Sequence, residues 1–137
     1  IANNMEFERK SANGIIDENT LRDLYLRVFD KAFSLYKPGC VMTSYNPVNG
    51  IYPCENSALL NDLLRGEWGF DGFVMTDWGS YDTADSIRSV CAGTNLLTPG
   101  SKKHFHMILK AVKRNEISKA ALQHSVKQIV KVLVRCI

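Results

Sequence analysis

Apolar residues recur along this chain with two different spacings, which alternate from one stretch to the next. Between residues 21 and 35 they fall at every third or fourth position, so the pattern predicts an amphipathic helix from Thr20 to the Pro38-Gly39 pair. The continuous apolar run at 73–75 is instead typical of a short strand that is buried on both faces, and residues 40–43 are predicted to form another strand. Further helices are predicted over about 55–67, 82–92, 104–114 and 118–135, with a last short strand at 95–97.

Polar residues mark where several of these helices begin. Thr20 is followed three residues later by Asp23, an approximate capping box that predicts the start of the first helix. Asp85 favours the amino end of a later helix through the helix dipole, and Ser118 or its neighbour is predicted to cap the last one. Helices and strands alternate, so the chain is predicted to be an α/β protein with about three parallel strand–helix units and a terminal pair of helices.

Composition excludes some classes of function. The chain has 137 residues, of which 45% are hydrophobic and 23% charged, as in an ordinary globular domain. The formal net charge of +3 is small and the basic residues are scattered, so we expect no nucleic-acid partner. No apolar run approaches the roughly 18 residues of a membrane-spanning helix, so no membrane partner is expected. The first residues do not resemble a signal peptide.

The cysteines and histidines point to neither a metal site nor a cofactor. The four cysteines lack the paired spacing of zinc ligands, and the apolar neighbours of Cys40 and Cys91 favour buried free thiols. Free thiols lean slightly toward a reducing compartment such as the cytoplasm, and the localisation is otherwise open. His104 and His106 are two positions apart on a predicted helix, so their side chains point to different sides and make a poor metal pair.

A candidate catalytic acid follows the second predicted strand. Residues 69–79 read Gly-Phe-Asp-Gly-Phe-Val-Met-Thr-Asp-Trp-Gly, and the aspartate in its ninth position is Asp77. In α/β folds the carboxyl ends of parallel strands face the crevice between the loops, where catalytic side chains gather. A lone aspartate at a strand end is also a common turn former or helix cap. Asp77 is therefore a candidate whose role depends on its surroundings.

Several segments of the chain, taken together, resemble glycoside hydrolase family 3, the β-glucosidases and their relatives. Residues 69–79 are similar to the segment of the family that carries the nucleophile. The other matching segments are Ala-Asn-Asn-Met-Glu at 2–6 with Arg9, Met-Thr-Ser-Tyr-Asn at 42–46, Asn49-Gly50, and Ala-Gly-Thr-Asn-Leu-Leu-Thr-Pro-Gly at 92–100. They follow the order of the family at about its spacing, and several segments in register are far more specific than one.

This resemblance implies a fold and a place within it. The catalytic domain of the family is a (β/α)8 TIM barrel, and a closed barrel needs about 250 residues. We therefore expect residues 1–137 to be a fragment of the glycoside hydrolase family 3 N-terminal barrel domain, namely its carboxyl-terminal part. The first part of the barrel and the following domain would be absent. Because a partial barrel leaves an open sheet edge, we also expect self-association.

The resemblance also implies a reaction. It is the hydrolysis of terminal β-D-glucosyl residues by a retaining β-glycosidase, through double displacement with Asp77 as the nucleophile. Arg9 and Tyr45 match residues that line the first sugar subsite and would donate hydrogen bonds to Asp77, and Trp78 would form an apolar wall against a sugar face. The Lys-His pair with which the family grips sugar hydroxyls precedes Ile1, and the general acid/base usually lies in the next domain. The isolated chain is therefore expected to be inactive on β-linked glucosides or oligosaccharides.

Two other functions stay open at this point. A TIM-barrel lyase or aldolase would use a Schiff-base lysine at a strand end, and none of the predicted strands ends in lysine. A truncated barrel piece that acts as a non-catalytic scaffold or assembly module is the other alternative. The length of the complete reading frame would separate this scaffold from a piece of a larger hydrolase.

Two details of the candidate site are also open. The general acid/base is not identified, because Glu55 and Glu67 flank a predicted helix and Glu116 lies between two helices. No pattern places any of them opposite Asp77. Thr98 departs from the family, which commonly has methionine before this Pro-Gly pair. We expect the change to affect packing at the barrel rim rather than the reaction.

Overall fold

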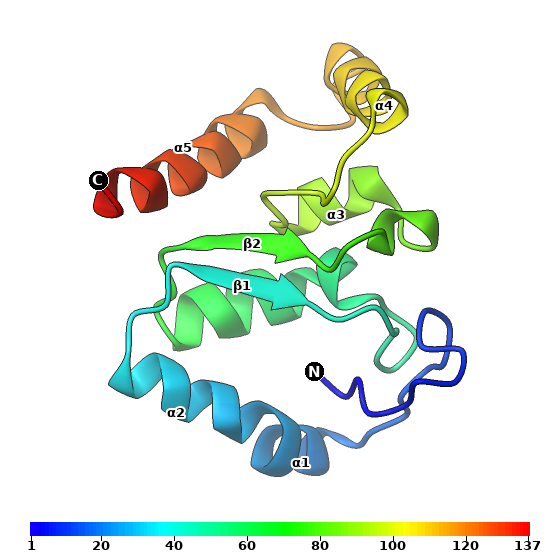
Figure 1. Cartoon of the computed structure of the whole chain (residues 1–137), viewed down its shortest axis with the longest axis vertical. Helices are drawn as coiled ribbons and strands as arrows, with labels where there is room; N and C mark the ends of the chain where they lie inside the picture. Colours follow the sequence, from blue (N-terminus) through cyan, green and yellow to red (C-terminus); the bar gives the residue numbers. More distant parts are fainter.

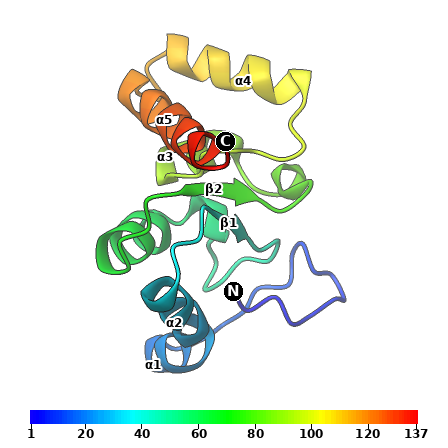
Figure 2. The same ribbon diagram turned by 60° about the vertical axis from the view of Figure 1, so that its left-hand side comes forward.

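Helices pack around a small parallel sheet in the structure, a computed structural model that describes residues 1–137 (Figure 1). Viewed from either direction, α1 and α2 lie beyond the β1 edge of the sheet, and α3, α4 and α5 lie beyond β2 (Figures 1 and 2). In chain order the elements are α1 (Glu18–Thr20), the π-helical η1 (Leu21–Leu26), α2 (Arg27–Leu35), β1 (Cys40–Thr43), the 3-10 turn η2 (Pro53–Glu55), the π-helical η3 (Ala58–Glu67), β2 (Phe73–Thr76), the 3-10 turn η4 (Ser80–Asp82), α3 (Ser86–Ala92), α4 (Lys102–Lys113) and α5 (Lys119–Arg135).

The sheet contains two strands, β1 and β2, which pair in parallel. The third strand expected at 95–97 is reduced to a single parallel bridge between Met75 and Leu96, so the prediction of three strands was wrong. The side chain of Asn95 explains the difference. Its Oδ1 accepts the main-chain N–H of Val74 at 2.7 Å, the donor that a third strand would otherwise pair with a carbonyl. The segment thus lies along β2 without forming a ladder.

The starts of the helices differ in detail from the prediction. The first helix is capped by Asp17, whose carboxylate accepts the N–H of Thr20 at 3.0 Å, so Thr20 is not its cap. The charged oxygen of Asp17 is the better acceptor, and Thr20 already lies within the first turn. Asp85 caps α3 by accepting two main-chain N–H groups at 2.8 and 2.9 Å, which delays this helix beyond the predicted start at 82. Ser118 caps α5 as predicted.

Two separate clusters form the hydrophobic core. The first lies between η3 and the sheet, and α2 packs against it through Phe33. The second joins α3, α4 and α5. The buried members of the first are Leu60, Leu64, Phe70 and Val74, and those of the second are Val90, Ala111 and Ile117. Helices therefore cover the sheet on one face and along the outer side of β2.

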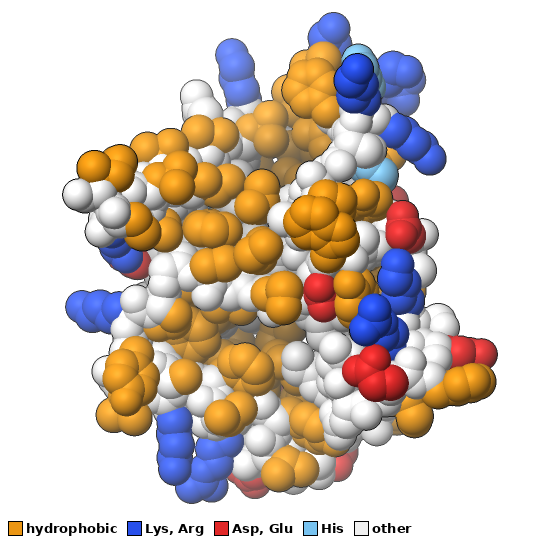
Figure 3. All heavy atoms as spheres, in the orientation of Figure 1, with side chains coloured by type: hydrophobic (Ala, Val, Ile, Leu, Met, Phe, Trp, Pro, Cys, Tyr) orange, Lys and Arg blue, Asp and Glu red, His pale blue; other side chains and the backbone are white.

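No helix covers the opposite face of the sheet. Met42 is 58% exposed and Leu96 is 37% exposed, and Figure 3 shows apolar side chains gathered across this face over β1, β2 and α5. Cys40 and Cys91 are exposed, so the prediction of buried thiols was wrong for both. Since side chains alternate along a strand and only one face of β1 is covered, Cys40 and Met42 point away from the core.

Candidate active site

Asp77 is the first residue after β2. The strand is a run of apolar and β-branched residues, and its inward side chains Val74 and Thr76 are almost fully buried. Asp77 itself is half-buried, and its Oδ1 accepts the main-chain N–H of Trp78 at 2.6 Å. Gly79 then adopts a left-handed conformation (φ 81°) that turns the chain sharply. The turn formed by Asp77, Trp78 and Gly79 thus holds the carboxylate at the carboxyl end of β2.

Tyr45 lies beside this turn because β1 and β2 are parallel and end at the same edge. Its side chain is 7% exposed, and its hydroxyl donates a 2.6 Å hydrogen bond to the carbonyl of Trp78. The Tyr45 hydroxyl, which was expected to donate to the Asp77 carboxylate, therefore donates to the carbonyl of the next residue, Trp78. Burial raises the pKa of the Tyr45 hydroxyl, and the neighbouring Asp77 carboxylate raises it further. Tyr45 consequently stays a neutral donor at neutral pH.

Two cations from the amino-terminal segment lie against the ring of Tyr45. The Cζ of Arg9 is 5.0 Å from the ring centroid, and the Nζ of Lys10 is 5.6 Å from it. Arg9 also pairs with Glu6 at 3.4 Å, and Lys10 with Asp82 at 3.2 Å. The structure thus brings Arg9 to Tyr45, as expected for a shared site. Lys10 was missed, because its only signal in the sequence is that it follows Arg9.

Trp78 is 67% exposed and stands next to Asp77 at the surface. The four candidate residues Asp77, Arg9, Tyr45 and Trp78 come from three separate segments of the chain. Tyr45 links them, since it contacts Arg9 through its ring and the Asp77–Trp78 turn through its hydroxyl. They form an open, positively flanked surface around one carboxylate.

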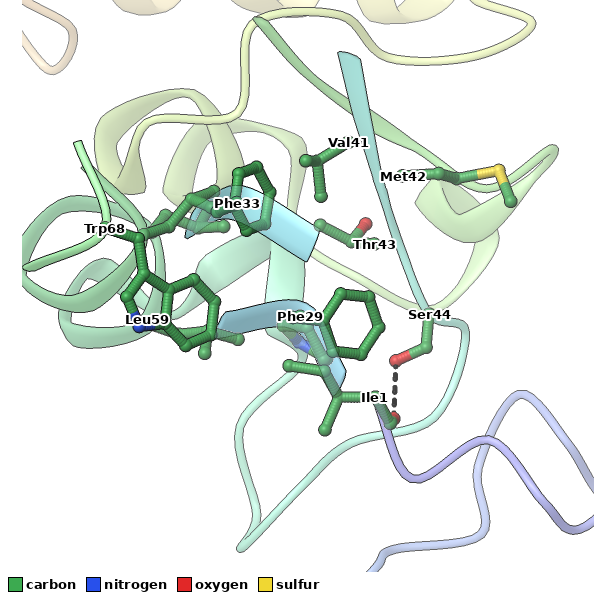
Figure 4. A pocket seen from close by; sticks show the side chains of 12 residues that line it. Ile1, Phe29, Phe33, Val41, Met42, Thr43, Ser44, Leu59 and Trp68 are labelled. Atoms are coloured by element: carbon green, nitrogen blue, oxygen red, sulfur yellow. Dashed lines mark hydrogen bonds between the residues drawn. The ribbon is translucent and has the colours of Figure 1, made fainter. Parts of the chain in front are cut away.

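A small apolar pocket lies away from this surface, between α2, η3 and β1 (Figure 4). Phe29, Phe33 and Trp68 lie around it, and the hydroxyl of Ser44 donates to the carbonyl of Ile1 at 3.1 Å at its rim. Its volume of about 40 Å³ is room for little more than one water molecule and not for a sugar ring. None of the four candidate residues lines it.

Two bonded threonines lie beside Asp77, and the sequence had singled out only Thr98, as a departure from the family. Thr76 is 1% exposed, and its side chain and carbonyl both bond to Thr98, which is 9% exposed. The contact was not predictable, because 22 residues separate the two positions and neither lies in a recognisable polar pattern. Both residues belong to segments that matched the family, which was the only signal available.

The three glutamates considered for the acid/base role are each occupied elsewhere. Glu55 accepts the main-chain N–H of Asp85 at 2.6 Å. Glu67 pairs with Arg22 at 3.3 Å, and Glu116 with Arg114 at 3.8 Å. These contacts join loops and helices to one another, and none of them involves Asp77.

The histidines also have local partners. The Nδ1 of His104 lies 2.6 Å from the hydroxyl of Ser101, and the Nδ1 of His106 lies 2.6 Å from the carbonyl of Lys102. The chain contains no group of three or more His, Cys, Asp or Glu side chains arranged to hold a metal ion. None of its helices has the length and apolarity needed to cross a bilayer.

An acid that directly follows a parallel strand, with helices packed around the sheet, is the arrangement with which α/β enzymes present a catalytic carboxylate. Residues 9–132 match the Glycosyl hydrolase family 3 N terminal domain, and the chain belongs to this family. The resemblance seen in the sequence is therefore confirmed.

Known proteins similar to the chain are β-glucosidases. "Probable beta-glucosidase J" of Aspergillus fumigatus is 36% identical over 97% of this chain and 15% of its own length. A "Beta-glucosidase" of Rhizobium radiobacter is 39% identical over 98% of this chain and 16% of its own length. Among solved structures, β-glucosidase 3B from Thermotoga neapolitana, in complex with glycerol, superposes with a TM-score of 0.91 at 39% identity, covering 97% of this chain and 20% of that one. The chain thus spans only a small part of each relative.

Proposed function

We propose that this chain carries the nucleophile of a retaining β-glycosidase of the β-glucosidase type, and that Asp77 is this nucleophile. The observation that carries the proposal is the position of Asp77, half-buried and directly after β2, whose inward side chains Val74 and Thr76 are buried. It is supported by relatives that are named β-glucosidases. The substrate is a β-linked glucoside or oligosaccharide with a terminal β-D-glucosyl residue.

The reaction proceeds by double displacement. The Asp77 carboxylate attacks the anomeric carbon, the bond to the leaving oxygen breaks, and a general acid protonates that oxygen. The same group then deprotonates a water molecule, which releases the sugar from Asp77. This chemistry needs a second carboxyl group about 5–5.5 Å from the nucleophile. Glu55, Glu67 and Glu116 each bond other residues, so none of these three is assigned this role. The proposal assigns the acid/base to the part of the polypeptide outside residues 1–137.

The neighbours of Asp77 have separate roles in this proposal. The hydroxyl of Tyr45, a neutral donor, holds the carbonyl of Trp78 and with it the turn that carries Asp77. Arg9 and the nearby Lys10 bring positive charge to the ring of Tyr45, beside the turn that carries Asp77. The exposed indole of Trp78 packs against an apolar face of the sugar.

The chain is, in this proposal, the carboxyl-terminal part of a (β/α)8 barrel that the rest of the polypeptide completes. The bare apolar face of the sheet supports this, because such a face is normally covered in a barrel. The small share of the solved relative that the chain covers supports it too. It follows that the isolated chain hydrolyses no alkyl β-glucosides and self-associates. A stable monodisperse monomer in size-exclusion chromatography would contradict the second expectation.

Covalent labelling tests the role of Asp77. The probe is 2-deoxy-2-fluoro-β-glucosyl fluoride, incubated with the full-length protein that contains this chain and, in parallel, with the 137-residue chain. Fluoride leaves without a proton, so labelling does not need the acid/base, and the fluorine at C2 slows breakdown of the intermediate. Intact mass should increase by one fluoroglucosyl group, and peptide mapping should locate it on Asp77.

Two variants control this experiment. Asp77→Asn should abolish the adduct and lower hydrolysis by the full-length protein by a factor on the order of 10⁴ or more. Asp62→Asn, at an exposed position on η3, should be labelled like the wild type. An adduct on a different carboxylate, or hydrolysis that survives Asp77→Asn, would overturn the proposal. An adduct on the full-length protein only would mean that the pocket needs the residues outside this chain.

A further inference from the structure

The chain on the amino side of Asp77 is held by a closed set of hydrogen bonds to Thr98. The hydroxyl of Thr98 donates to the carbonyl of Thr76 at 2.5 Å, and the N–H of Thr98 donates to the Oγ1 of Thr76 at 2.9 Å. The two Oγ1 atoms lie 3.2 Å apart. A threonine hydroxyl has one proton, and that of Thr98 is already used, so the Thr76 hydroxyl is the donor across this contact.

The carbonyl of Thr76 belongs to the peptide unit whose nitrogen is that of Asp77. The Thr98 hydroxyl therefore fixes the plane of the peptide bond from which Asp77 projects. On the other side of Asp77, the N–H of Gly79 donates to the carbonyl of Thr98 at 2.9 Å. Thr98 consequently holds the chain immediately before Asp77 and two residues after it.

This arrangement is buried and carries no charge. Thr76 and Thr98 are 1% and 9% exposed, so water does not compete for their hydrogen bonds. An arginine or lysine in the same place would hold the strand end as well, but it would also form an ion pair with the carboxylate. A neutral hydroxyl restrains the main chain and leaves the carboxylate free to react.

We propose that Thr98 is a positioning residue for Asp77, acting through its hydroxyl on the Thr76–Asp77 peptide unit. The proposal rests on the role of Asp77 as the nucleophile. It differs from the expectation that Thr98 affects only packing, because its hydroxyl makes a specific contact to the chain that bears the reacting group. A small displacement of a reacting group lowers rates steeply, so loss of this contact slows attack about 10- to 100-fold.

The test compares the rate at which 2-deoxy-2-fluoro-β-glucosyl fluoride labels Asp77 in variants of the full-length protein. Thr98→Val replaces the hydroxyl by a methyl group of similar size and should label about 10- to 100-fold more slowly. Thr98→Ser keeps the hydroxyl and loses the methyl group, and it should label at nearly the wild-type rate. With an activated aryl β-glucoside, Thr98→Val should lower kcat and leave KM within about twofold.

Thr94→Val is the matched control. Thr94 is fully buried, and its hydroxyl donates to the carbonyl of Cys54 at 2.8 Å, so the substitution removes the same kind of hydrogen bond from a different loop. Both valine variants should unfold at a lower temperature than the wild type. Only Thr98→Val should label slowly, which a purely structural role would not produce. Should it fail to fold, the Thr98→Ser and Thr98→Ala pair, which differ only in the hydroxyl, repeats the comparison.

The outcomes separate this proposal from the one on which it rests. Asp77 labelled at equal rates in the wild type and Thr98→Val would overturn the role of Thr98 and leave the nucleophile assigned. Equal slowing by Thr98→Ser would attribute the effect to packing of the methyl group, and equal slowing by Thr94→Val would attribute it to general destabilisation. Either result would also overturn the positioning role of Thr98. A wild-type protein with no label on Asp77 would refute both proposals together.

Discussion

The two ends of β2 are held by different kinds of interaction. At its start, Asp71 bonds Lys131 at 2.5 Å and Arg135 at 2.8 Å, both on α5. The guanidinium of Arg65 reaches the carbonyl of Gly72 at 3.0 Å from η3. At its end the contacts to Thr76, Trp78 and Gly79 come from the uncharged residues Thr98 and Tyr45. Charge thus anchors the start of the strand, and hydroxyl and main-chain groups anchor its end.

Under the proposed function, this difference separates residues that stabilise the strand from residues that serve the reaction, on a strand of four residues. In parallel barrels the edge where strands start contributes mainly to stability, and the edge where they end carries the catalytic groups. The acid at the start, Asp71, pairs with two cations, whereas the Oδ1 of Asp77 accepts the main-chain N–H of Trp78. Substitutions at the start should therefore change the free energy of unfolding, and those at the end should change the reactivity of Asp77.

The largest effect is expected at Gly72. A Cβ there would overlap the carbonyl of Gly39, whose carbon would lie only 2.8 Å away, so β1 and β2 could not approach as they do. Gly72→Ala should lower the free energy of unfolding by about 3 kcal/mol, measured by urea denaturation. Gly14→Ala, where the added methyl group makes ordinary contacts at 3.7 Å, should change it by less than about 1 kcal/mol. Equal stability of the two variants would show that the strands can shift apart at no cost.

Arg65 should have the next largest effect on stability. Its guanidinium bonds the carbonyl of Gly72 and, at 2.9 Å, the Oδ1 of Asn95, and Arg65→Met leaves both acceptors with fewer partners. The expected loss is about 1–3 kcal/mol in the free energy of unfolding. Arg88→Met, which removes a side chain that is 75% exposed, should cost less than about 0.5 kcal/mol. In folded Arg65→Met, Asp77 should still be labelled at the wild-type rate. Slow labelling would contradict the idea that the start of β2 affects stability and its end affects the reactivity of Asp77.

Tyr45→Phe tests the opposite end of the strand. Loss of the hydrogen bond to the carbonyl of Trp78 should slow labelling of Asp77 by about tenfold, with a stability loss of about 1 kcal/mol. Tyr36→Phe, at a side chain that is 71% exposed, is the control and should change neither quantity. A Tyr45→Phe variant that loses stability but keeps its labelling rate would assign Tyr45 a structural role only.

The Tyr45→Phe variant should also differ from the wild type in how its stability depends on high pH. Because burial, and then Asp77, raise the pKa of Tyr45 above its ordinary value of 10.0, the folded protein keeps this proton where the unfolded chain loses it. The contribution to stability is therefore complete below pH 10 and is lost as the pH rises through the higher pKa of the folded state. As the pH rises above 10, the free energy of unfolding of the wild type should fall more steeply than that of Tyr45→Phe, measured by urea denaturation.

The smallest effect is expected at Asp71. The hydrogen bonds from Arg135 and then Lys131 lower the pKa of this carboxyl to about 2, from 3.8. The stabilisation is therefore present above pH 3.8 and is lost as the pH falls toward 2. Since the side chain is 50% exposed, solvent screens the pair, and Asp71→Asn should cost only about 0.5–1 kcal/mol at pH 7. High salt should shrink this difference.

The local elements of this protein were determined by its sequence alone. The amphipathic stretches became helices, and the apolar run at 73–75 became β2, with Asp77 directly behind it. Ser118 capped α5 as its position suggested. These features depend on spacing over a few residues, which is why they could be predicted, and the segments in register were enough to predict the family.

Only the tertiary structure decided how the end of β2 is held. Lys10 reaches the ring of Tyr45, and Thr98 reaches the main chain beside Asp77, across separations that leave no periodic signal. Asn95 turned the expected third strand into a single bridge by supplying a side-chain acceptor to β2. Hydrogen-bond partners far apart in the sequence are chosen by where the packed helices bring the chain. Local spacing therefore predicts the elements, and packing selects the contacts between them.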